Sequence, residues 1–252
     1  MTRRLIRLSL LACSLLISNT LRADGLSDLR SALEKLKGTQ PIKARVRAEV
    51  SANSTDDATP MTGTGKMEVL VEHNDSGIAV KWSQADLQKV REESHSKNGN
   101  TNSVLILRQT MDSFEAALMR SLLDQADRLL KDLEGATVQS DAKEALNGTP
   151  MRKLVLKLDA TLSEAEKKSV KTITTTLDLW LNEASLPVYS EEKTERKGSR
   201  FFISFGSTET QKKSYQVVGD RLLVKQLETS NAWSVPIAGS YSQTNKFNVT
   251  VQ

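Results

Sequence analysis

Few residues in this chain have the types and spacing that suit catalysis. The two histidines, His73 and His95, lie far apart, and neither belongs to a metal-binding pattern such as His-Glu-x-x-His. Glu191-Glu192 and Asp56-Asp57 are paired only by adjacency, and neighbours on a strand point to opposite faces. We therefore expect both histidines at the surface, both acidic pairs in solvent, no catalytic residue and no enzymatic activity.

The chain also lacks the usual cofactor and metal patterns. It has no Gly-x-Ser-x-Gly elbow, no phosphate loop and no Gly-x-Gly-x-x-Gly. Gly63-Thr64-Gly65 precedes a strand pattern rather than a helix, so we interpret it as the end of a loop. Cys13 is the only cysteine, so the rest of the chain has no thiol for a metal or a disulfide. We expect no cofactor and no metal.

The first 23 residues form a segment of their own. Arg3, Arg4 and Arg7 precede an apolar stretch from Leu8 to Ile17, and the small residue Ala23 follows shortly after. This layout predicts a cleaved secretory signal peptide over residues 1–23, and the stretch is too short to suit a transmembrane helix. A buried N-terminal helix is the alternative. We expect a periplasmic protein with no transmembrane segment after cleavage.

Two further expectations follow from the same segment. Residues 10–13, Leu-Leu-Ala-Cys, loosely resemble a bacterial lipobox, so a form anchored by a lipid on Cys13 is a second possibility. Residues 1–23 hold four Arg and no acid, and the remaining chain has 31 Lys+Arg against 31 Asp+Glu. The basic pI of about 9.1 therefore reflects the segment, and we expect no nucleic-acid partner.

Hydrophobic periodicity predicts both helices and strands. Residues 26–37, 84–95 and 105–133 have helical spacing or could begin a helix, and the last stretch carries a long apolar stripe that includes Met111, Phe114, Leu122 and Leu133. Alternation of apolar and polar residues predicts the strands. Strand-like patterns of this kind cover residues 42–50, 64–72, 78–82, 137–146, 151–159, 173–181, 188–196, 201–205, 214–218, 221–228 and 247–251.

Turn signals separate several of these strands. Asn147-Gly148 is a two-residue hairpin signal, Gly219-Asp220 joins two further strands, and residues 74–77 form a turn. Together the elements predict an α+β fold with eight to ten antiparallel strands and two or three helices. We expect one domain over residues 24–252 with a helical insert around 84–135.

Three stretches resemble the outer-membrane lipoprotein carrier superfamily, which includes LolA, LolB and RseB. They are the opening helix and strand over 29–50, the turn and apolar strand over 146–156, and the strand, Leu-Pro step and strand over 177–188. The resemblance implies a curved antiparallel sheet, an unclosed barrel, around a helical lid. It also implies an apolar concave face that holds the acyl chains of a lipid or lipoprotein and needs no catalytic residue.

The expected ligand-binding residues lie on two strands in the second half of the chain. They are Leu154, Leu156, Leu158, Leu177, Leu179 and Trp180. Trp180 alternates with the leucines around it, so two buried faces on its strand would mean that both sides of the sheet are covered. The alternative function is an envelope protein-interaction or stress-sensor component on the same fold without lipid cargo, which the aromatic content of only 4% favours.

Overall fold

The fold was determined as a computed structural model. The structure describes residues 24–54, 62–95, 101–160, 162, 164, 166–200, 203–235 and 239–252. The expected signal segment with Cys13, and the Asp56-Asp57 pair, lie outside the described residues.

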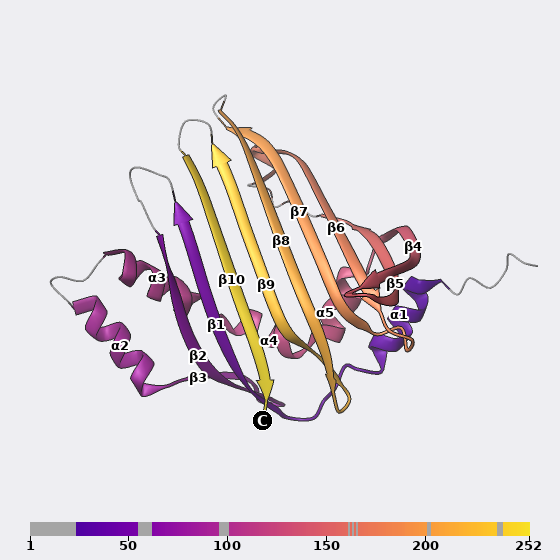
Figure 1. Ribbon diagram of the computed structural model, residues 1–252, viewed down its shortest axis with the longest axis horizontal. Coiled ribbons are helices and arrows are strands. Elements are labelled where there is room, and N and C mark those ends of the chain that lie inside the picture. The colour runs from indigo at the N-terminus through magenta and orange to yellow at the C-terminus, as the bar shows by residue number, and fades with distance from the viewer. Residues whose placement is uncertain are drawn as a thin grey trace, which may run out of the picture.

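The protein has an α+β fold built on one unclosed sheet of ten antiparallel strands, as the sequence predicts (Figure 1). The strand order is β3-β2-β1-β10-β9-β8-β7-β6-β5-β4, so β3 and β4 are the two edges. The strands are β1 (Ile42–Ser54), β2 (Thr62–Asn74), β3 (Gly77–Trp82), β4 (Thr137–Leu146), β5 (Thr149–Leu158), β6 (Val170–Leu181), β7 (Pro187–Arg200), β8 (Ile203–Val218), β9 (Arg221–Val235) and β10 (Gly239–Val251).

The only neighbours in this sheet that are not consecutive in the chain are β1 and β10. Their pairing, for example Val46 opposite Val249, joins the three N-terminal strands to the seven that follow the helices. Two of the hairpin turns are tight. Asn147 and Gly148 have φ angles of 51° and 83°, the left-handed pair that a type I′ hairpin needs. Gly219, with φ of 60°, turns β8 into β9 as the sequence predicts.

α3, α4 and α5 lie behind the sheet in Figure 1, on what we call its inner face, and α2 lies beside the β3 edge. α3 contacts β2 and β1, α4 and α5 contact β9, and α1 contacts α5 beside the β4–β5 end of the sheet. The elements are α1 (Gly25–Glu34), α2 (Gln84–His95), α3 (Thr101–Asp112), α4 (Ala116–Leu123), α5 (Gln125–Asp132) and a short 3-10 helix (Glu166–Lys168). Among the described residues, no helix combines the length and apolar character needed to cross a membrane.

The structure corrects three predicted boundaries. The single helix expected over 105–133 is three helices, because the chain bends at residues 113–115 and again at Asp124 as it crosses the sheet. The first of these helices, α3, begins at Thr101, four residues before the predicted start at 105. The strands expected over 201–205 and 214–218 belong to one long strand, β8.

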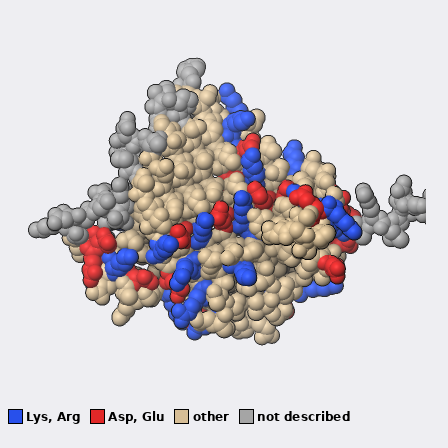
Figure 2. Space-filling view, in the orientation of Figure 1, with Lys and Arg blue, Asp and Glu red and all other residues tan. Residues whose placement is uncertain are grey.

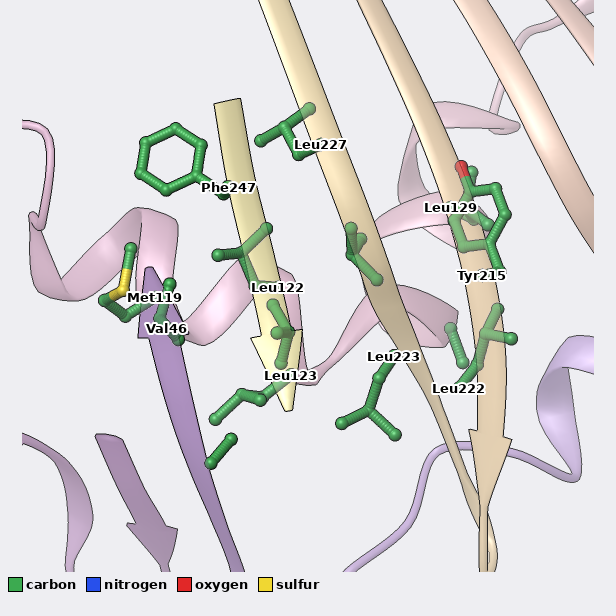
Figure 3. Packing of buried hydrophobic residues seen from close by; sticks show 14 of the residues in the cluster. Val46, Met119, Leu122, Leu123, Leu129, Tyr215, Leu222, Leu223, Leu227 and Phe247 are labelled. Atoms are coloured by element: carbon green, nitrogen blue, oxygen red, sulfur yellow. The ribbon is translucent and has the colours of Figure 1, made fainter. Parts of the chain in front are cut away.

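The core fills the space between the helices and the inner face. Figure 3 shows Leu122 and Leu123 of α4 and Leu129 of α5 packed between the helices and the strands that carry Leu227 and Phe247. All five side chains are at most 3% exposed. The apolar stripe on the predicted long helix therefore packs as core.

Candidate functional site

The five leucines expected to bind a ligand are together on the inner face, and helices cover them. Leu154, Leu156 and Leu158 of β5 lie beside Leu179, Leu177 and Thr175 of β6 in the register. The leucines are between 0% and 9% exposed and belong to the main core cluster. A Cβ on Gly25 of α1 would lie 2.7 Å from Leu154 Cδ2, so α1 rests directly on this row. A ligand reaches the leucines only if helices move.

Trp180 lies on the opposite, outer face, so it does not join the leucines. Its ring packs at 5.4 Å from that of Tyr189, and Lys153 Nζ lies 4.4 Å from its centroid. These neighbours come from the adjacent strands β7 and β5 and leave Trp180 only 7% exposed. The burial of Trp180 therefore requires no second layer over the sheet, contrary to the interpretation that both faces are covered.

The register divides the inner face into an apolar part and a polar part. One row across the sheet runs from Ala48 through Phe247 and Leu227 to Lys213, and on to Ser190 and Leu179. In the next row, Val50 is followed by Asn245, Thr229, Gln211 and Glu192 before apolar residues return at Leu177. On β10 and β9, apolar side chains thus give way to polar ones between these two rows, whereas β8 and β7 carry polar side chains in both.

At this boundary, a polar cluster is buried beneath the helices. Lys213 and Tyr215 project from β8, and Ser190 and Glu192 project from β7. The Ser190 and Tyr215 hydroxyls are 2.7 Å apart and share a hydrogen bond. Lys213 is 6% exposed, and it makes no ion pair or hydrogen bond with another described residue. Sequence reasoning missed this cluster, because a polar residue in a predicted strand was assigned to solvent.

Burial shifts the pKa values of all three titratable groups in this cluster. Desolvation lowers the pKa of Lys213 below its ordinary value, and the negative charge of Glu192 opposes that shift. Desolvation raises the pKa of Glu192, with Lys213 acting in the opposite direction. It also raises the pKa of Tyr215. The expectation that Glu192 is solvated was therefore wrong: it points inward, toward the side that carries Arg128 and Asp132 of α5.

Beyond the buried cluster, the central strands present an inner polar surface. It consists of Tyr241, Gln243 and Asn245 on β10, Thr229, Asn231 and Trp233 on β9, Ser207, Glu209 and Gln211 on β8, and Thr194 and Arg196 on β7. Most of these residues are half-buried, and Asn231 and Trp233 are exposed. The Trp233 and Tyr241 rings stack with centroids 6.2 Å apart and planes at 29°.

A second polar cluster holds the junction between α4 and α5. Asp124 is the single residue between the two helices, and it accepts a hydrogen bond from Arg221 Nη1. Its other oxygen lies 3.3 Å from His73 Nδ1, and Arg221 Nη2 donates to the Gln40 carbonyl at 2.8 Å. The expectation of a surface position was wrong for His73, whose side chain is 13% exposed, and right for His95.

The outer face of the sheet is charged in a band, and above this band a large uncharged area covers the middle of the face (Figure 2). The band contains cross-strand ion pairs such as Lys66–Glu49 at 2.8 Å and Lys246–Glu228 at 3.2 Å.

Two open cavities of about 460 and 640 Å³ are lined mostly by polar residues. Gly, Ser, Thr and charged residues line most of the first, and Arg120, Arg128, Lys131 and four acidic or histidine side chains line most of the second. Neither resembles a pocket for an apolar ligand.

Metal ligands do not gather in the described part of the chain, where no group of three or more His, Cys, Asp or Glu residues is arranged to hold an ion. Comparison with known proteins gives no assignment: no protein-family model matches the chain, and no curated protein is significantly similar to it.

Proposed function

We propose that this is a non-catalytic envelope protein that binds apolar chains, such as the acyl chains of a lipid or lipoprotein, between the inner face of its sheet and helices α4 and α5. The observation that carries the proposal is the way the apolar part of the inner face is covered. We call this part the apolar band, and it includes Ala48, Phe247, Leu227, Leu179, Leu177, Leu156 and Leu154. Two eight-residue helices joined by the single residue Asp124 shield it, and they contact it through Leu122, Leu123 and Leu129.

Physical chemistry supports exchange of these helices for a ligand. Each CH₂ group that an acyl chain buries contributes about 0.8 kcal/mol, so a long chain recovers much of the apolar contact that displaced helices lose. Helices of this length have little stability of their own in water and depend on packing. The band is therefore able to serve as a ligand surface when the helices swing away and as a closed core when they return.

The burial of the polar cluster favours binding over catalysis. Lys213 and Tyr215, two titratable groups of this cluster, are only 6% and 9% exposed. A substrate does not reach them while α5 is in place. Their neighbours also form no nucleophile–base pair aimed at an open site, and that geometry is the first requirement for general acid–base chemistry.

Export is the part of the proposal that rests on residues 1–23. Three arginines before an apolar stretch favour cleavage near Ala23 and release into the periplasm, with lipidation of Cys13 as the alternative. Sequencing the N-terminus of protein recovered from cells distinguishes these routes, since one yields a free N-terminus near residue 24 and the other a blocked one at residue 13. An intact N-terminus on all of the protein would contradict export.

The binding proposal is tested by native mass spectrometry of protein from an envelope fraction, followed by titration of the delipidated protein with palmitate. We expect bound acyl chains in the first measurement and saturable uptake in the second. Leu177→Asn places an amide in the apolar band and should weaken palmitate binding, with circular dichroism to check folding. Trp180→Phe, on the outer face of the same strand, is the matched control. A folded protein that takes up no palmitate rules the proposal out.

A second candidate function is a protein-interaction or sensor component, and one observation favours it. The apolar band is filled by the chain's own helices, with Leu154, Leu156 and Leu179 all at 0% exposure. If the protein is an interaction or sensor component, the helices stay packed on the apolar band, and a partner protein binds to the outer surfaces of the molecule. Pull-down from an envelope fraction after delipidation separates the two candidates, because only this one requires a partner that survives lipid removal.

A further inference from the structure

The inner polar surface has the chemistry of a binding site that the apolar band does not explain. Its side chains are amides, hydroxyls, one carboxylate, one guanidinium and two aromatic rings, spread over β10, β9, β8 and β7. Four neighbouring strands spaced about 4.8 Å apart place the outermost two about 14 Å apart, which makes a surface of useful size. It begins one row beyond the apolar row that contains Leu227 and Phe247.

Hydrogen bonds fix the side chains on the β10 side of this surface. Gln109 of α3 donates to the Tyr241 hydroxyl at 2.9 Å and to Gln243 Oε1 at 3.2 Å. Gln243 in turn donates to Asn245 Oδ1 at 2.7 Å. Gln109 Oε1 is buried and has no partner among the described residues, so this network has an acceptor to spare. These amides are oriented before any ligand arrives.

A second network fixes the β8 side. Gln211 Nε2 donates to Glu209 Oε1 at 2.9 Å, and Arg196 Nη1 donates to Glu209 Oε2 at 3.4 Å. Because the carboxylate and the guanidinium pair with each other, this side has no excess charge. The surface therefore favours a ligand without a net charge over a phosphate or a polycation.

The strand between the two networks, β9, carries side chains that are available to bind a ligand. Asn231 lies opposite Gln243 on one side and Glu209 on the other, and its amide makes no hydrogen bond with another described residue. Trp233, two residues along, is 39% exposed although it is a large apolar side chain. Trp233 therefore offers an exposed ring surface, and Asn231 beside it offers an unpaired amide. Both lie between the two fixed networks, so a ligand can contact the ring and hydrogen-bond to the amide.

We propose that the inner polar surface binds a neutral oligosaccharide, with Trp233 under a sugar ring and Asn231 on its hydroxyls. A sugar ring offers adjacent hydroxyls, which amides, carboxylates and guanidinium groups bind through paired donors and acceptors. It also offers a face of C–H groups, which suits the negatively polarised face of an indole. An extended peptide requires an open sheet edge or apolar side-chain pockets, and this surface lies on interior strands and has neither.

This site is independent of the apolar band, because it requires no movement of α4 or α5. The test is isothermal titration calorimetry of the full purified chain with three soluble probes: cellotetraose, chitotetraose and maltotetraose. We expect saturable binding of at least one of them. Trp233→Ala should raise its Kd about tenfold, and Asn231→Ala should raise it several-fold. Asn231→Ala should leave the melting temperature unchanged, because its side chain is exposed. Trp233→Ala should lower the melting temperature only modestly, because it loses the stack on Tyr241.

The matched control is Ser234→Ala, on the same strand as Trp233 but on the other face, and it should leave the Kd unchanged. Absence of saturable binding by all three sugars overturns the inference, as does binding that survives Trp233→Ala. An unstructured Gly–Ser–Asn peptide is titrated in parallel. Binding of the peptide but no sugar, lost in Trp233→Ala, overturns the oligosaccharide assignment. If the wild-type protein binds a sugar but takes up no palmitate, the acyl-chain function is contradicted and the oligosaccharide site is supported.

Discussion

Arg221, at the start of β9, donates a hydrogen bond to Asp124, the single residue that joins α4 to α5. The Arg221 side chain is 5% exposed and that of Asp124 is 18% exposed, so water screens their interaction little. Arg221 also holds the Gln40 carbonyl on the segment before β1. One guanidinium thus ties the helix junction to the sheet and to the loop at its end.

Arg221→Met should destabilise the fold, because it leaves the poorly solvated Asp124 carboxylate without its guanidinium partner. Breaking one partner of a buried pair costs about 3 kcal/mol or more, and we expect a loss of that size in the free energy of unfolding. Urea denaturation followed by circular dichroism measures it. Lys246→Met, which breaks the exposed pair with Glu228, is the control and should cost less than about 1 kcal/mol. Equal losses in the two variants would show that Arg221 has no special role.

The same contact should govern access to the apolar band if acyl chains enter beneath the helices. Asp124→Asn keeps the shape of the junction but weakens its bonds to Arg221 and His73. Each 1.4 kcal/mol of weakening raises the population of an opened state about tenfold, so the initial rate of palmitate uptake should rise by about that factor. Stopped-flow fluorescence with a labelled fatty acid measures the rate. An unchanged rate in a destabilised variant would mean that ligands do not enter through this junction.

Buried Lys213 and half-buried Glu192 should lower the stability of the fold at neutral pH, because desolvation of a charge shifts the pKa of each. Replacing both in Lys213→Met/Glu192→Gln should therefore raise the free energy of unfolding by about 1–4 kcal/mol. Chemical denaturation at pH 7 measures the difference. Lys193→Met/Glu195→Gln, an exposed pair on the outer face, is the control and should change stability little.

The signs of the two shifts also set a pH dependence. Folded Glu192 keeps its proton to higher pH than the unfolded side chain does, so wild-type stability falls as pH rises above the ordinary value of 4.5. Folded Lys213 loses its proton at lower pH than the unfolded amine, so stability recovers as pH rises toward the ordinary value of 10.5. The advantage of the double variant should be largest between these limits. An advantage that does not vary with pH would contradict desolvation as its source.

Sequence patterns predicted the parts of the fold where one face is apolar and the other polar. β1 is the clearest case: Ala44, Val46 and Ala48 are buried, as the alternation predicts, and Arg45 and Arg47 are exposed. Asn147-Gly148 specified its hairpin because few other residue pairs adopt two left-handed conformations in succession. Both signals are local, so the sequence is enough to find them.

The ends of the long strands were missed because both of their faces are polar. Residues 229–231 of β9 alternate between Thr, Ser and Asn, which gives no contrast for a period of two to detect. The junction cluster was missed for a different reason. Arg221 and Asp124 are 97 residues apart, and only the packing of α5 against β9 brings them together. The predicted ligand residues were found on the inner face except Trp180, whose own alternation already placed it on the other side.

Gly65 has a structural role that its position in Gly63-Thr64-Gly65 did not reveal. These residues belong to β2, not to a loop end, and α3 packs on them. A Cβ on Gly65 would lie 2.9 Å from Ile106 Cγ2 and 3.2 Å from the Ile106 carbonyl oxygen, and it would also meet the Thr110 hydroxyl. Because the Ile106 carbonyl belongs to the backbone, no rotation of a side chain relieves this clash. The whole helix α3 must therefore shift.

Gly65→Ala should therefore destabilise the protein by about 1–3 kcal/mol, the usual cost of overpacking a core. It should also move Gln109 away from Tyr241 and so weaken the network on the β10 side of the inner polar surface. Thermal unfolding measures the first effect and oligosaccharide affinity the second. Gly206→Ala is the matched control, since a Cβ on that strand glycine would have no described atom within 4 Å and a methyl group fits there. If the two variants melt at the same temperature, α3 does not lie against β2 as described.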